Sequence, residues 1–424
     1  LTSVMDDMRP ENKYLHLMDE QEAIAKAQAL LNRPGDANVS PLAVYRHAAK
    51  ADSVQQRRPN VVLIMMESMS AKFMKHFGQS ETLTPFLDSL YTRSISFRNF
   101  YSAGIHTNHG LYATLYSFPA MMKRNLMKGS VIPRYSGLPT VLQENGYCNL
   151  FFMTHESQYD NMNAFLRTNG FDEIYAQENY PSEKVVNSFG VQDDFMYQYA
   201  LPILNERAGT GNPFFSVLLS ISNHPPYVIP PYFHPHSDVL EEQIVEYADW
   251  SIRQFMQAAE KQPWFDNTIF VFLGDHGKMV GTPECEMPQS YNHIPLMIYG
   301  KDIKPGVYDG FGGQVDVSPT LLGLLNISYL QNNFGVNLLE EERPCMFFTA
   351  DNLIGARDSV NMFIYSPDSQ QEFKYKLEEG KLHAATGTDE EAFRNLKDYC
   401  FSMLQSTESL VKEHKTLDKV SVKK

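Results

Sequence analysis

The hydrophobic residues of this chain gather in short runs, and four of these runs are followed, within about three residues, by a potential metal ligand or proton-transfer group. The four runs are 60–66, 149–153, 214–221 and 268–273. The groups that follow them are Glu67, His155, His224 and the pair Asp275 and His276. Runs of this length and composition are typical of buried strands. Because sites form beyond the carboxyl ends of parallel strands, we expect these side chains to converge at one edge of a sheet.

Segments with apolar residues at helical spacing alternate with these runs. Helices are expected at 188–204, 241–261 and 316–325, and further helices are expected to begin near Pro85 and Thr107. The alternation predicts an α/β fold whose mainly parallel central sheet is flanked by helices on both faces.

The two ends of the chain differ from this central pattern. Residues 1–58 carry one clear helix, with Asp19 as its N-cap and Glu22 in capping-box position. We interpret them as a helical approach segment, and a partly disordered linker is the alternative. Residues 59–365 then form the main domain. Residues 366–424 are expected to form a small α+β subdomain of strands and a helix, followed by a lysine-rich, solvated tail.

Composition narrows the classes of function. The 424 residues are 43% hydrophobic and 20% charged, which suits a globular fold with a large core. A net charge of −14 argues against nucleic acid as a partner. A membrane-spanning helix needs roughly 18 apolar residues in a row, and the sequence contains no such run. No signal peptide is visible, and the chain begins with Leu1, so we expect any membrane anchor to lie in a segment that this chain lacks.

The spacing of the cysteines does not predict a cysteine-based metal site. The four cysteines form no CxxC pair and no Cys/His cluster, so a zinc-finger site is not expected. Their pairing as disulfides or their presence as free thiols stays open.

The threonine at the start of one predicted helix has two interpretations. Leu111, Leu115 and Phe118 recur at helical spacing, so the helix is expected to begin near Thr107. A threonine there is commonly an N-cap. The alternative is a nucleophile, because a helix N-terminus favours negative charge and a nearby metal ion would favour the alkoxide. His106 and His109 flank the threonine and are candidates for substrate contact.

The order of these motifs resembles that of the alkaline phosphatase/sulfatase superfamily. The matching stretches are NVVLIMMES, AGIHTNHG, SISNHPPY, GDHG, NHIPLMIYG and DVSPTLLGLL, within residues 59–365. Within the superfamily the chain most resembles the extracellular catalytic domain of lipoteichoic acid synthase-type phosphoglycerol transferases. The resemblance implies an alkaline phosphatase-like fold and a location on the extracytoplasmic face of the cell membrane, behind transmembrane helices.

The resemblance also implies roles for individual residues. It implies that one divalent metal ion, Mn²⁺ before Mg²⁺ or Zn²⁺, is bound by Glu67, Thr107, Asp275 and His276. Thr107 would be the nucleophile, and a phospho-threonine would form from a phosphodiester such as a phospholipid head group or a glycan-linked phosphodiester. The expected substrate-binding residues are His155, His224, His109, Asn161 and His293.

Two departures from the family pattern keep other activities open. The synthases usually carry a Trp and an Arg after the first substrate histidine, where this chain has Tyr159, Asp160, Asn161 and Met162. Sulfatases need a C/S-x-P-x-R sequence, and this chain has none, so sulfate ester hydrolysis is the least expected chemistry. Phosphoethanolamine transfer, phosphodiester or phosphomonoester hydrolysis, and a binding protein without activity remain the alternatives.

Overall fold

The computed structural model describes most of the chain. The described residues are 15–33, 45–48, 58–122, 124–128, 132–378, 380–385, 390–413 and 415–416. The predicted lysine-rich tail and much of the predicted approach segment lie outside these residues.

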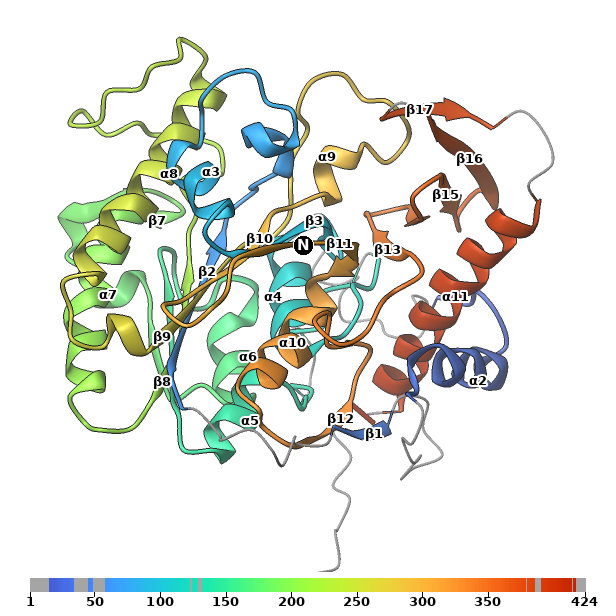
Figure 1. Ribbon diagram of the computed structural model, residues 1–424, viewed down its shortest axis with the longest axis horizontal. Coiled ribbons are helices and arrows are strands. Elements are labelled where there is room, and N and C mark those ends of the chain that lie inside the picture. Colours follow the sequence, from blue (N-terminus) through green and yellow to red (C-terminus); the bar gives the residue numbers. More distant parts are fainter. Residues whose placement is uncertain are drawn as a thin grey trace, which may run out of the picture.

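An eight-stranded sheet forms the centre of the molecule (Figure 1). Its strands are β2 (Asn60–Met66), β3 (Ile95–Tyr101), β4 (Cys148–Met153), β5 (Glu173–Tyr175), β8 (Phe214–Leu219), β9 (Thr268–Gly274), β10 (Leu296–Tyr299) and β11 (Gly306–Gly313). The strand order is β11-β3-β10-β9-β2-β8-β4-β5. Neighbouring strands are parallel except where β10 pairs with β3 and β9. The predicted mainly parallel sheet is therefore confirmed.

Helices cover both faces of this sheet. They are α3 (Pro85–Tyr91), α4 (Thr107–Tyr116), α5 (Leu138–Glu144), α6 (Met162–Thr168), α7 (Asp193–Ala208), α8 (Leu240–Ala259) and α10 (Val317–Leu324). Smaller elements are α9 (Gln289–Asn292) and the hairpin of β6 (Val185–Asn187) and β7 (Gly190–Val191). Single 3₁₀ turns are η2 (Ala71–Phe73), η3 (Lys75–Phe77), η4 (Tyr159–Asn161), η5 (Gln177–Asn179), η6 (Ser182–Lys184), η7 (Phe265–Asn267) and η8 (Gln314–Asp316).

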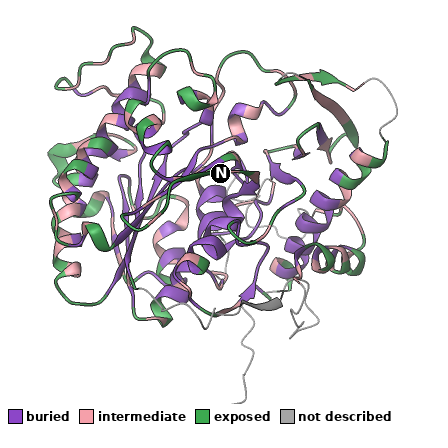
Figure 2. Ribbon diagram, viewed as in Figure 1, coloured by how far each residue is buried: buried purple, intermediate pink, exposed green. Residues whose placement is uncertain are grey.

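The central strand β2 shows why the sheet needs two helical layers. All seven of its residues are buried, and successive side chains of a strand point to opposite faces. Val61, Leu63 and Met65 belong to the apolar core under α4, α5, α6 and α10. Val62 and Ile64 belong to a second core under α3, α7 and α8. Figure 2 shows the resulting continuous buried layer through the sheet.

The C-terminal part of the chain forms a second, antiparallel sheet (Figure 1). Its five strands, in spatial order, are β13 (Met346–Thr349), β14 (Ile354–Arg357), β15 (Asn361–Ser366), β16 (Gln371–Glu378) and β17 (Lys381–Ala384). Helix α11 (Glu390–Lys412) covers one face, where Phe401 meets the rings of Phe363 and Tyr365. On the other face, Tyr375 donates a hydrogen bond to Glu286 of the loop after β9.

The N-terminal segment packs on this C-terminal unit. The predicted helix is α2 (Glu20–Leu31), begun by the predicted N-cap Asp19, and it lies against α11, where Lys26 pairs with Asp398 at 3.2 Å. Strand β1 (Tyr45–Ala48), which the sequence pattern does not predict, pairs with β12 (Tyr329–Asn332).

The predicted limits of the main domain can be placed on this fold, although they stay a prediction. The boundary at residues 365 and 366 falls at the end of β15, which pairs along its whole length with β16. No helix within the described ranges is both long enough and apolar enough to span a bilayer.

Candidate active site

Four strand ends lie side by side at one edge of the central sheet. Met65 of β2 is paired with Leu273 of β9 and with Leu219 of β8, and Leu219 is paired with Met153 of β4. The chain therefore leaves all four strands at the same level. The groups that follow them in the sequence accordingly reach a common region.

Glu67, Asp275 and His276 form a compact cluster at this edge. Each of them offers a ligand atom that lies within 4.8 Å of the others, and both carboxylates are almost fully buried, at 1% and 0% exposure. The Ser68 hydroxyl donates to Glu67 Oε1 at 2.6 Å, and the Ser68 backbone N–H donates to Asp275 Oδ1 at 2.8 Å. His276 donates through Nδ1 to the Gly277 carbonyl at 2.8 Å, and its Nε2 faces the carboxylates, 3.8 Å from Glu67 Oε1 and 3.6 Å from Asp275 Oδ2.

The electrostatics of the cluster fit a bound cation. Burial and the Asp275 carboxylate raise the pKa of Glu67. Burial works against protonation of His276, but the carboxylates of Asp275 and Glu67 still raise its pKa. Asp275 Oδ2 is buried and receives no hydrogen bond from the described residues. Two buried carboxylates with an imidazole form a mixed oxygen and nitrogen ligand set, which suits a divalent metal ion.

Thr107 reaches this cluster from the first turn of α4. Its hydroxyl donates to Glu67 Oε2 at 3.3 Å. The N-cap of α4 is His106, which makes no side-chain capping bond, so Thr107 is the first helical residue and not the cap. Gly110 permits this approach, because a Cβ at that position would come within 2.1 Å of the Asp275 carbonyl oxygen.

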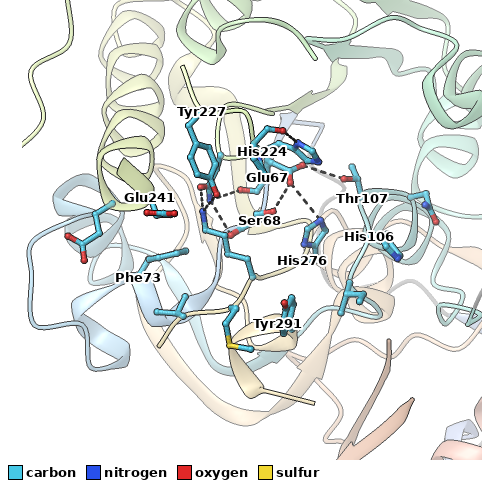
Figure 3. A pocket seen from close by; sticks show the side chains of 18 of the residues that line it. Glu67, Ser68, Phe73, His106, Thr107, His224, Tyr227, Glu241, His276 and Tyr291 are labelled. Carbon is cyan, nitrogen blue, oxygen red and sulfur yellow. Dashed lines mark hydrogen bonds and ion pairs between the residues drawn. The ribbon is translucent and has the colours of Figure 1, made fainter. Parts of the chain in front are cut away.

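A pocket of about 620 Å³ opens above the cluster (Figure 3). Thr107 and His106 stand on one side of it, and Phe73, Tyr227 and Glu241 stand on the other. The carboxylate of Glu67 lies between these two walls. The pocket therefore spans the candidate nucleophile and a second wall built from other segments of the chain.

The structure places two predicted substrate-binding histidines near the cluster. His224 lines the pocket, and its Nδ1 lies 2.6 Å from the Pro225 carbonyl oxygen. His155 is 2% exposed and packs behind Tyr159, with ring centroids 4.7 Å apart. Burial lowers the pKa of His155, and its Nε2 has no hydrogen-bond partner among the described residues.

His155 is not among the described residues that line this pocket, and the other three predicted substrate-binding residues do not line it either. Asn161 donates to the Met127 carbonyl at 2.7 Å. His109 is buried beside His106, and burial lowers the pKa of His109 to about 3. His293 stacks on the ring of Tyr101 and contacts the Arg98 carbonyl through Nε2 at 2.8 Å, and burial lowers its pKa to about 4.

Several pocket residues are missing from the sequence prediction. Lys278, two positions after His276, contacts Asn223 and Tyr227, and burial lowers the pKa of Lys278 to about 8. Asp160 also lines the pocket, where it accepts a hydrogen bond from Asn108 at 3.1 Å. Proximity in the sequence to the GDHG motif is the one signal that could have drawn attention to Lys278.

The sequence model of the sulfatase family matches residues 59–327. The chain belongs to the sulfatase family. That matched region contains β2 to α10 and therefore every strand of the central sheet. The family assignment confirms the resemblance to the alkaline phosphatase/sulfatase superfamily.

Relatives in this family include enzymes of lipoteichoic acid synthesis. Lipoteichoic acid synthase 2 of Bacillus subtilis is 24% identical over 339 residues, which cover 70% of this chain and 50% of the relative. Phosphoglycerol transferase I of Xanthomonas campestris is 26% identical over 331 residues, which cover 73% of this chain and 47% of the relative. The chain spans about half the length of these relatives.

Solved structures share the fold over nearly the whole chain. A protein of the alkaline phosphatase superfamily from Vibrio parahaemolyticus matches with a TM-score of 0.85 and 25% identity, covering 96% of this chain and 99% of that one. The lipoteichoic acid synthase LtaP from Listeria monocytogenes matches with a TM-score of 0.71 and 21% identity, covering 84% and 93%. The sulfatase-family chain therefore has the alkaline phosphatase superfamily fold.

Proposed function

We propose that this protein is a metal-dependent phosphoglycerol-type transferase that acts on a phosphodiester through a phospho-threonine intermediate. The observation that carries the proposal is the position of Thr107. Its hydroxyl lies at the N-terminus of α4, 3.3 Å from Glu67. Thr107 also lines the pocket that opens above the candidate metal cluster. A helix N-terminus stabilises developing negative charge, as a nucleophilic oxygen requires.

The residues fit a two-step transfer. In the first step, the Thr107 oxygen attacks phosphorus, the bond to the leaving alcohol breaks, and the phosphoryl group with its glycerol substituent stays on Thr107. In the second step, the oxygen of an acceptor alcohol attacks the same phosphorus and releases Thr107. His224, on the pocket wall, would give a proton to the leaving oxygen, a contribution of roughly 10²–10⁴-fold in rate. His155 is proposed to contact the phosphate or glycerol group.

Glu67, Thr107, Asp275 and His276 would hold the metal ion, for which we propose Mn²⁺. The buried carboxylates and the correctly oriented imidazole support this assignment. A divalent ion bound there would neutralise phosphoryl charge and lower the pKa of a coordinated hydroxyl. Ser68 orients the carboxylates of Glu67 and Asp275 by donating a hydrogen bond to each of them.

The proposed substrate is a phospholipid head group or a glycan-linked phosphodiester, used at the extracytoplasmic face of the cell membrane. The relatives named lipoteichoic acid synthase and phosphoglycerol transferase support this class. Because the chain spans about half of those proteins, the acceptor and the membrane attachment of the whole protein are proposals as well.

Product analysis tests the proposed function. The protein with Mn²⁺ would be incubated with phosphatidylglycerol, with phosphatidylethanolamine, and with each lipid plus excess glycerol as the acceptor, and the products would be identified by mass spectrometry. We expect diacylglycerol and a glycerophosphoglycerol product from phosphatidylglycerol. Release of free glycerol phosphate alone would make the protein a hydrolase, and reaction only with phosphatidylethanolamine would make it a phosphoethanolamine transferase.

A further inference from the structure

The wall of the pocket opposite Thr107 carries an ammonium group with no assigned role. Lys278 Nζ donates to Asn223 Oδ1, and it lies 3.3 Å from the Tyr227 hydroxyl. It also lies 5.4 Å from the ring centroid of Phe73 and 4.9 Å from that of Tyr227, within cation–π range. The ammonium is thus held on the wall that Phe73 and Tyr227 form in Figure 3.

Asn223 fixes the orientation of this group relative to the candidate metal cluster. Its Nδ2 donates to the backbone carbonyls of Glu67 and Ser68, at 3.1 and 3.2 Å. This leaves its Oδ1 as the acceptor that faces Lys278. Asn223 is 1% exposed, so its amide has one way to satisfy these contacts. Lys278 is therefore positioned, through one buried amide, with respect to the segment that carries Glu67.

The positive charge of Lys278 lacks a close counter-ion in the described part of the chain. No described carboxylate lies within 4.0 Å of Nζ, and the acidic groups that act on it, Glu67 and Glu241, do so from farther away. An ammonium has three donors, and Asn223 and Tyr227 account for two. A half-buried charge without a partner is costly unless an ion completes it.

We propose that Lys278, with Asn223 and Tyr227 as its supports, is an anion-binding subsite that pairs with an oxyanion of the substrate. The subsite rests on the proposed phosphodiester chemistry at Thr107 and deepens it. An anionic oxygen that enters the pocket accepts a hydrogen bond from the third N–H of Lys278 and supplies the missing counter-charge. Because Lys278 and Thr107 stand on different walls, a substrate held by both is oriented across the pocket before reaction.

Two groups of a substrate are able to supply the anionic oxygen that pairs with Lys278. It belongs to the reacting phosphoryl group, or it belongs to a second anionic group on the part of the substrate that lies beyond it. The experiment below separates these sources with two p-nitrophenyl phosphodiesters. In one the second ester group is neutral, and in the other it carries a carboxylate.

The first measurement is the binding of inorganic phosphate to the protein in Mn²⁺ buffer, followed by calorimetry without turnover. Lys278→Met should weaken phosphate binding by at least about tenfold, the factor that corresponds to ~1.4 kcal/mol. Lys278→Arg keeps the charge and should keep most of the affinity. The matched control is Lys72→Met, a half-buried lysine next to Phe73 that lies outside the pocket lining.

The second measurement is the KM for the two phosphodiesters. If Lys278 pairs with the reacting phosphoryl group, Lys278→Met raises KM for both esters. If it pairs with a second anion, KM rises only for the ester with the carboxylate. Should the wild type turn over neither ester, the lipid assay above still decides the proposed function, and the calorimetric result still decides the subsite.

Two results would overturn the subsite. One is phosphate binding by Lys278→Met that equals that of the wild type. The other is an equal loss in Lys278→Arg and Lys278→Met together with lower thermal stability, since this would mean that Lys278 acts by holding Asn223. Lys278→Gln replaces the Met variant if the latter does not fold.

Discussion

The proposed role of Thr107 as a nucleophile is compatible with its position, because its hydroxyl is not used in capping α4. His106 occupies the N-cap position, and the Thr107 hydroxyl points instead to Glu67. The choice between a cap and a nucleophile, which the sequence leaves open, therefore turns on which residue begins the helix. That position favours the nucleophile and leads to a prediction about Thr107 variants.

Replacing Thr107 should separate stability from activity. Thr107→Ala removes one hydrogen bond, so the free energy of unfolding should fall by only about 1 kcal/mol. Turnover of a phosphodiester should nevertheless almost vanish, because the covalent route is lost. Thr107→Ser keeps the hydroxyl and should retain some turnover. Thermal unfolding and initial rates measure the two effects. Activity of the Ala variant above about a tenth of wild type, a barrier change under ~1.4 kcal/mol, would contradict the nucleophile.

At the scale of elements, α8 supplies the N-terminal capping group of α3. Thr84, the N-cap of α3, makes no side-chain capping bond. Asp249 of α8 accepts hydrogen bonds from the backbone N–H groups of Phe86 and Leu87, at 3.0 and 2.8 Å. Asp249 is 2% exposed, and burial raises its pKa from 3.8 to about 7. The nearby Asp88 contributes to this rise, while the two backbone donors and Arg253 oppose it.

This contact predicts a pH dependence of stability. A carboxyl group with a raised pKa in the folded state stabilises the fold most when it is protonated, so its contribution is lost as pH rises toward 7. Asp249→Asn cannot ionise. The free energy of unfolding of this variant, relative to that of the wild type, should therefore be about 2 kcal/mol higher at pH 8 than at pH 5. Urea unfolding at both pH values measures this difference.

The control for this prediction is a carboxylate on the surface. Asp266 is 63% exposed and pairs with Lys301, so Asp266→Asn should show little drift relative to wild type over the same pH range. A pH-independent difference between Asp249→Asn and wild type would mean that Asp249 stays ionised in the folded protein.

At the scale of the whole molecule, the candidate metal cluster ties together segments that are distant in the sequence. Glu67 follows β2 and Asp275 follows β9, more than two hundred residues later, and the Ser68 backbone N–H joins the two loops through Asp275. A metal ion that binds only the assembled cluster stabilises the fold as a whole, by roughly 2.7 kcal/mol at a hundredfold excess over Kd.

Metal removal should therefore change stability and activity together. Dialysis against EDTA should lower the Tm by several degrees and abolish turnover, and added Mn²⁺ should restore both. Glu67→Gln removes one of two buried negative charges that repel each other. Without metal, this variant should melt above the metal-free wild type, and it should gain little Tm from Mn²⁺. Calorimetry with and without Mn²⁺ measures these Tm values. A wild-type Tm that changes with neither EDTA nor Mn²⁺ would refute a metal site at Glu67.

Local patterns in the sequence were sufficient to predict the central fold and the position of the cluster. Each buried strand is a continuous apolar run, and its functional group follows within a few residues, so neither observation depends on distant contacts. Parallel packing then brings Glu67 and Asp275 to one edge, which the topology bears out. The C-terminal strands and the helix α11 were visible in the same way.

Only the tertiary structure decided which polar side chains face the pocket and which pack elsewhere. His293 and Lys278 both stand near predicted motifs. However, the ring of His293 stacks on Tyr101, whereas Lys278 meets Tyr227 at the pocket wall. The cap of α3 by Asp249 likewise joins residues about 160 positions apart. The physical reason is that side-chain direction depends on packing between segments far apart along the chain, and periodicity records only the burial of each segment by itself.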